Sequence, residues 1–191
     1  MNSPLPDLLD AEDLPEAVLR AAVLDGELYP VGPCYRPVDL PPDAAARASA
    51  LRSTASQARV LAGRTAAWVW GAAADPGEPL SAFVPSTAAV GHTSPLLGAS
   101  IRVVRLRASD VMRLDGVPLT TPLRTAIDLL CAAAPSPARA DRLGVHALLA
   151  IAGATAEDLL ADLATRSRLV GRDRAIALAE ALRADAFGVA A

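Results

Sequence analysis

The sequence predicts an α+β protein with a small mixed or antiparallel sheet, several helices and a helical C-terminal tail. Three observations support this class. Short apolar or alternating segments, typical of strands, are interspersed with segments of helical periodicity. Proline and glycine divide the chain into short elements. Apolar residues make up 52% of the 191 residues and aromatic residues only 3%, which predicts an aliphatic core.

The first 42 residues are expected to form a reduced, winged-helix-like segment. A helix is predicted over residues 14–24, with Asp13 as its N-cap and Pro15 in its first turn. Two short strands, 27–31 and 34–38, follow around Gly32. A helix followed by a β-ribbon is the C-terminal half of a winged helix-turn-helix. The prolines at 41 and 42 mark the end of this segment.

Residues 43–191 are expected to form the main α+β domain. Asp43 is predicted to cap a helix over 43–57, and Gly71 to end a helix over 64–70. Strands are predicted over 80–85 and 100–107. The pair Asp115-Gly116 predicts a type I′ hairpin between strands 111–114 and 117–119.

Helices dominate the rest of the chain. Thr121 is expected to cap a helix that has Pro122 at its first position. A helical tail over 135–186 is predicted to contain helices 141–152, 155–165 and 172–186. Thr155 with Asp158 matches the pattern of a capped helix start.

Composition excludes several kinds of chemistry. All 18 basic residues are arginine, so no Walker A lysine, Schiff-base lysine or nuclease-core lysine is present. The histidines His92 and His146 are isolated, and no spacing supplies the three or four ligands of a metal site. Cys34 and Cys131 are expected to be reduced thiols. We therefore expect neither a cofactor nor an enzyme activity.

Charge is unevenly distributed along the chain. Residues 1–46 carry nine acidic residues and two arginines, whereas residues 47–70 carry four arginines and no acid. The N-terminal stretch has neither a basic region followed by an apolar run nor any span of about 20 apolar residues. A cytoplasmic location without membrane contact is therefore expected.

Two segments echo each other, each with one arginine near the start of a predicted helix: residues 61–71, LAGRTAAWVWG, and residues 116–130, GVPLTTPLRTAIDLL. We predict that Arg64 and Arg124 belong to an internal ion pair that pins the two helices, with Asp128 one turn after Arg124 as the acceptor. A phosphate or partner contact is the alternative. Trp68 and Trp70 are about 200° apart on a helix, so Trp70 is a candidate partner anchor.

The remaining arginines offer candidate contacts to nucleic acid, with a solvated surface as the alternative. Phosphates are bound chiefly by basic side chains. A second arginine group surrounds Gly171 at positions 166, 168, 172 and 174. The candidates for phosphate contact are Arg52, Arg59, Arg102, Arg105 and Arg107.

The two echoed segments, in this order after a helix and β-ribbon, resemble the AbiEi-type antitoxin and transcriptional-regulator family of actinobacteria. The resemblance covers roughly residues 14–130 and weakens in the tail. It implies an N-terminal winged helix that binds operator DNA, and an α+β domain tied to antitoxin activity in type IV toxin–antitoxin systems. Some relatives continue into a nuclease-like domain, which we expect to be absent here.

The resemblance predicts a non-enzymatic antitoxin or transcriptional regulator. Its candidate partners are duplex DNA and a nucleotidyltransferase-like toxin or another protein, and the oligomeric state is left open. Residues 1–46 depart from the family pattern, since their net charge of −7 would repel phosphates. A protein-interaction module that has lost DNA binding is therefore the alternative.

Overall fold

The computed structural model describes residues 6–55, 59–88 and 98–188, and it confirms the α+β class. A two-stranded antiparallel sheet joins β1 (Leu28–Val31) and β2 (Cys34–Pro37). A five-stranded mixed sheet has the order β5-β4-β3-β7-β6. Its strands are β3 (Val60–Leu61), β4 (Leu80–Pro85), β5 (Ala99–Val104), β6 (Val111–Leu114) and β7 (Val117–Thr120).

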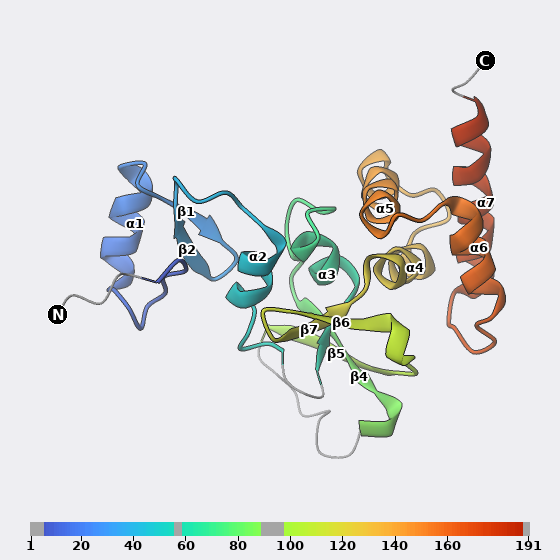
Figure 1. Ribbon diagram of the computed structural model, residues 1–191, viewed down its shortest axis with the longest axis horizontal. Coiled ribbons are helices and arrows are strands. Elements are labelled where there is room, and N and C mark those ends of the chain that lie inside the picture. Colours follow the sequence, from blue (N-terminus) through green and yellow to red (C-terminus); the bar gives the residue numbers. More distant parts are fainter. Residues whose placement is uncertain (1–5, 56–58, 89–97, 189–191) are drawn as a thin grey trace.

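The N-terminal unit consists of helix α1 (Glu16–Leu24) and the β1–β2 hairpin (Figure 1). Leu9, Leu19 and Leu28 form its small apolar cluster. Pro15, not the predicted Asp13, occupies the N-cap position of α1. The carboxylate of Asp13 instead accepts a hydrogen bond from the backbone N–H of Asp10 at 3.1 Å.

A second apolar cluster joins this hairpin to the main sheet. Val31 of β1 packs there with Leu51, Leu61 and Trp68. Helix α2 (Ala44–Ala50) begins after Asp43, whose side chain accepts from Ala46 N as predicted. The helix ends at Ala50 rather than at residue 57. Helix α3 (Gly63–Val69) supplies the tryptophan, so both short helices bridge the hairpin and the sheet.

The sheet is assembled from local hairpins and parallel pairings. Strands β6 and β7 pair around Asp115 and Gly116, whose φ values of 47° and 77° fit the predicted I′ turn. Strand β3 lies parallel to β7, and the edge strand β5 lies parallel to β4. Strand β5 ends at Val104, before the predicted end, so Arg105 and Arg107 follow the strand.

Helix α4 (Pro122–Ala132) packs against α3 and begins as predicted, with Thr121 accepting from Arg124 N. The largest apolar cluster lies between α4 and the tail, and includes Ile127, Leu148 and Leu163. Thr155 and Asp158 form the predicted capping box. The tail helices, which gather beside α4 in Figure 1, are α5 (Arg139–Ala152), α6 (Ala156–Ala164) and α7 (Arg172–Gly188).

Within the described ranges, no helix alone has the length and apolarity to cross a bilayer. Among these helices, only α5 and α6 taken together reach that length and apolarity, and a 90° bend separates them.

Gly171 lets the α6–α7 turn lie directly against α4. Its φ is +81°, and a side chain there would collide with the backbone carbonyl of Cys131. Gly153, which ends α5, also has a positive φ of +61°, but open space surrounds it. The two glycines therefore share a backbone requirement and differ in steric contact.

We predict that Gly171→Ala destabilises the fold by more than the about 1–2 kcal/mol that a positive φ costs an alanine. The excess comes from the collision with Cys131. Gly153→Ala is the matched control, because it carries the backbone cost alone. Urea unfolding of both variants measures the difference, and equal losses would contradict the close packing of this turn.

Candidate functional site

One buried carboxylate organises the junction of the sheet, α4 and the tail. Asp110 ends a short 3-10 helix (Ala108–Asp110) and is 1% exposed. Its Oδ2 accepts from Arg124 Nη1 at 2.7 Å and from Arg166 Nη1 at 3.0 Å. Its Oδ1 accepts from Arg166 Nη2 at 2.6 Å. Charge-assisted and bidentate bonds of this kind are strong and directional, so Asp110 fixes two distant segments together.

The predicted pairing of Arg124 is confirmed. Arg124 Nε donates to Asp128 Oδ1 at 3.0 Å, and both side chains are buried. The prediction that Arg64 belongs to this internal ion pair is wrong. Its guanidinium is half exposed and pairs with Asp75 at 2.6 Å, in the loop between α3 and β4. Helices α3 and α4 contact each other through Ala67, Ala126 and Ile127 instead of an arginine.

A second carboxylate extends the network towards the surface. Asp162 on α6 accepts from Arg166 Nη2 at 2.7 Å and from Arg107 Nη1 at 3.0 Å. Arg107 Nη2 also donates to the carbonyl of Thr165 at 2.8 Å. Arg107, predicted as a phosphate contact, is therefore occupied in holding α6 to the segment after β5.

The network shifts the pKa values of two aspartates in opposite directions. Burial alone would raise the pKa of Asp110, but hydrogen bonds from Arg166 and the charge of Arg124 outweigh it and hold that pKa below its ordinary value. Burial raises the pKa of Asp128 to about 6, because Arg124 compensates only in part. The geometry agrees, since Asp128 Oδ2 is buried and accepts no hydrogen bond.

An arginine-lined cavity of about 440 Å³ opens beside this network. It lies between β5, α4 and the turn from α6 to α7. Its polar lining consists of one carboxylate, Asp128, and five arginines, and its apolar lining includes Phe83, Val103 and Val170. The five arginines are Arg102, Arg105, Arg124, Arg168 and Arg174.

Four of these arginines have no carboxylate partner among the described residues. Arg105 and Arg168 are exposed. Arg102 stacks over Phe83, 5.7 Å from its ring centroid, and Arg174 Nη1 donates to the carbonyl of Ala133 at 2.8 Å. Two sequence-predicted candidates, Arg102 and Arg105, thus line the same cavity as two arginines of the tail, Arg168 and Arg174.

The other two candidates for nucleic-acid contact lie elsewhere. Arg52 pairs with Asp115 of the β6–β7 turn at 2.8 Å and donates to Ser49 at 3.2 Å. Arg59 directly precedes β3 and is half-buried. Neither residue lines the arginine-lined cavity. The structure therefore does not bring the five predicted candidates to one surface.

Trp70, the candidate partner anchor, has contacts within the fold. Trp70 is half-buried and packs against both of the larger apolar clusters. Its indole Nε1 donates to the carbonyl of Thr120 at 3.0 Å. Buried tryptophans usually satisfy their N–H in this way. Trp70 therefore fastens the C-terminal end of α3 to the end of β7.

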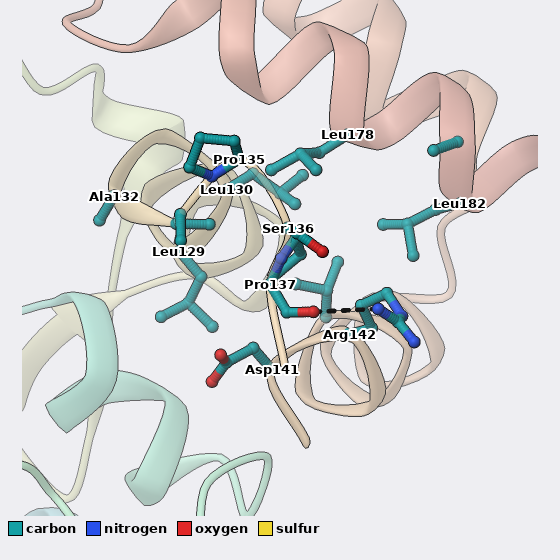
Figure 2. A pocket seen from close by; sticks show the side chains of 14 residues that line it. Leu129, Leu130, Ala132, Pro135, Ser136, Pro137, Asp141, Arg142, Leu178 and Leu182 are labelled. Carbon is teal, nitrogen blue, oxygen red and sulfur yellow. Dashed lines mark hydrogen bonds between the residues drawn. The ribbon is translucent and has the colours of Figure 1, made fainter. Parts of the chain in front are cut away.

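A second cavity, of about 470 Å³, is mainly apolar and lies between α4, α5 and α7. Figure 2 shows Leu129 and Leu130 on one side and Leu178 and Leu182 on the other. Its charged residues are Asp141 and Arg142, and Arg142 Nη1 donates to the carbonyl of Pro137 at 2.9 Å. This lining brings together no nucleophile with an activating base.

Among the residues that the structure describes, no group of three or more His, Cys, Asp or Glu could hold a metal ion. His146 is exposed on α5, and His92 lies outside the described residues. Cys34 and Cys131 are free thiols, as predicted, and burial raises the pKa of Cys131 to about 11. Comparison with protein-family models, curated proteins and solved structures finds no match to this chain.

Sequence analysis missed Asp110, the carboxylate at the centre of the site, and the role of its partner Arg166. Asp110 follows an arginine-rich strand and carries no local indication of a buried role. Its partner Arg166 is 56 residues further along the chain. The group around Gly171 was recognised, but its members divide: Arg166 is structural, whereas Arg168 and Arg174 line the arginine-lined cavity.

We predict that Asp110→Asn lowers the free energy of unfolding by about 3–5 kcal/mol, because it removes the shared charge from two buried guanidiniums. Asp75→Asn is the control, since it breaks the exposed pair with Arg64 and should destabilise the fold far less. Chemical denaturation measures both. Similar small losses in the two variants would show that Asp110 does not hold the junction.

Asp128 predicts a specific pH dependence of stability. A folded-state pKa of about 6, above the ordinary 3.8, means that its stabilising contribution is present below about pH 4 and is lost as pH rises through 6. Relative to Asp128→Asn, the wild type should lose about 2–3 kcal/mol between pH 4 and 7. Denaturation at several pH values measures this difference.

Asp158→Asn is the control for that measurement. The pKa of Asp158 is lowered by its hydrogen bonds with Thr155, so its contribution has the opposite sign. The wild type should gain stability relative to this variant as pH rises towards about 4, and this difference should then stay level up to pH 7. If both differences have the same sign, the buried state of Asp128 is refuted.

Proposed function

We propose that the chain is a non-enzymatic antitoxin or transcriptional regulator of the AbiEi type, acting in the cytoplasm by binding nucleic-acid phosphates. The observation that supports it best is the gathering of four arginines without carboxylate partners at the arginine-lined cavity: Arg102, Arg105, Arg168 and Arg174. Phosphate oxygens are the ligands that guanidinium groups bind in a bidentate manner. The partner in this proposal is duplex DNA.

Residues 6–42 are a poor surface for the same task. Both of their arginines are engaged: Arg20 with Glu16 at 2.8 Å and Arg36, which is buried, with Asp43 at 3.0 Å. A helix and hairpin that approach DNA must present cations to its backbone. The proposal therefore moves DNA contact from the winged-helix-like segment to the main domain.

The absence of enzyme activity is part of the proposal. Asp128, the carboxylate in the lining of the arginine-lined cavity, is paired with Arg124 at 3.0 Å. Asp110 is saturated with donors, and the Cys131 thiol is kept protonated by burial. An acid–base pair within reach of a nucleophile, which catalysis requires, is not among the described residues.

A protein-interaction module that has lost DNA binding is the second candidate. The acidic N-terminal unit with its internally paired arginines favours it. In this alternative, the partner is a nucleotidyltransferase-like toxin or another protein. A toxin gene of that kind beside the gene for this chain would support the antitoxin proposal.

We expect binding to duplex DNA to weaken steeply with salt, because each phosphate contact releases a counterion. The double substitution Arg105→Ala with Arg168→Ala should reduce the slope of log K against log salt by about 2. Arg139→Ala with Arg183→Ala is the matched control, since both residues are exposed on the tail and the charge change is equal. Fluorescence anisotropy between about 50 and 200 mM salt measures the slopes.

Two results would decide against the proposal. If the control pair of substitutions reduces the slope of log K against log salt by the same amount, any exposed arginine contributes to binding and no defined DNA-binding surface exists. Failure of the wild type to bind duplex DNA at low salt would leave the protein-interaction module as the better account.

A further inference from the structure

The arginine-lined cavity combines features that a surface tracking a DNA backbone does not require. It combines cations at its rim, an apolar wall and one buried acceptor. Its volume, about 440 Å³, lies within the range of pockets that enclose small ligands. We propose that it binds a nucleotide, with the phosphates among the arginines and the base against the apolar wall and Asp128.

The phosphate end is set by charge. Five arginines and one carboxylate line the cavity, and two of the arginines, Arg105 and Arg168, are exposed and form no hydrogen bond or ion pair with the described residues. Arg174 is already oriented by its bond to the Ala133 carbonyl. A ligand with one phosphate leaves much of this charge uncompensated, whereas a diphosphate offers oxygens to several guanidiniums.

The base end is set by a buried atom. The Asp128 side chain is 7% exposed, and its Oδ2 accepts no hydrogen bond from the described residues. An acceptor left unsatisfied in this way is costly, and a ligand that carries N–H donors would relieve the cost. The exocyclic amine of an adenine is such a donor.

Apolar side chains in the lining of the same cavity complete the arrangement. Val170 is 81% exposed and Val103 is 49% exposed, and both line the cavity with Leu169. Arg102 and Arg124 lie over Phe83, at 5.7 and 5.9 Å from its ring centroid. A flat guanidinium next to an apolar wall is a surface on which an aromatic base can stack. Pyrophosphate and sugar phosphates lack the group that would use it.

Isothermal titration of the full chain with ADP, ribose 5-phosphate and pyrophosphate tests the proposal, without nucleic acid. We expect ADP to bind about tenfold or more tightly than either ribose 5-phosphate or pyrophosphate. Arg168→Ala should weaken all three probes by about tenfold, and Arg139→Ala should weaken none. Arg168 is exposed and forms no hydrogen bond or ion pair with the residues that the structure describes, so this variant is expected to fold.

Asp128→Asn supplies a readout specific to the base. It places an amide where the carboxylate faces the donor, so the preference for ADP over pyrophosphate should fall by about tenfold. An unchanged preference, or no heat with any probe at millimolar concentration, overturns the proposal. This outcome is separate from that of the DNA experiment. If ADP binds and duplex DNA does not, the nucleotide proposal stands. If duplex DNA binds and ADP does not, only the nucleotide proposal is rejected.

Discussion

The bidentate contact between Asp110 and Arg166 is the interaction on which the arrangement of the main domain depends. It joins the segment before β6 to the turn after α6, and the same carboxylate holds Arg124 of α4. Two guanidiniums this deeply buried would be unfavourable alone. Because one aspartate satisfies both, the tail helices take a fixed position against α4, and the cavity between them has a defined shape.

This internal pairing also explains which arginines remain for binding. Arg124, Arg166 and Arg107 pair with carboxylates, whereas the arginines Arg102, Arg105, Arg168 and Arg174 of the cavity have no carboxylate partner in the described part of the chain. The net charge of −3 conceals this separation, since the acidic residues concentrate in the N-terminal unit. The result is a chain that is acidic overall and locally strongly basic, a distribution that directs anions to one face.

Local elements could be predicted from the sequence because short-range rules decide them. The Asp115-Gly116 turn, the Thr121 cap and the Thr155–Asp158 box each involve residues within three positions of one another. The prediction for Arg64 was wrong because it depended on a contact between residues distant in the sequence. Its proposed partner required a tertiary contact, whereas Asp75, 11 residues along the chain, reaches it within a loop. The cavity depends on β5, α4 and the tail together, which no local pattern encodes.

The hairpin of the N-terminal unit is fastened to the main sheet by close packing. A Cβ at Gly32 would lie 3.3 Å from the Trp68 ring, and Val31 is buried with Leu51 beneath it. A chain shortened to residues 43–191 would therefore expose the Trp68 indole and Leu51 to water. Because exposed apolar patches favour self-association, the acidic unit covers a surface that would otherwise be adhesive.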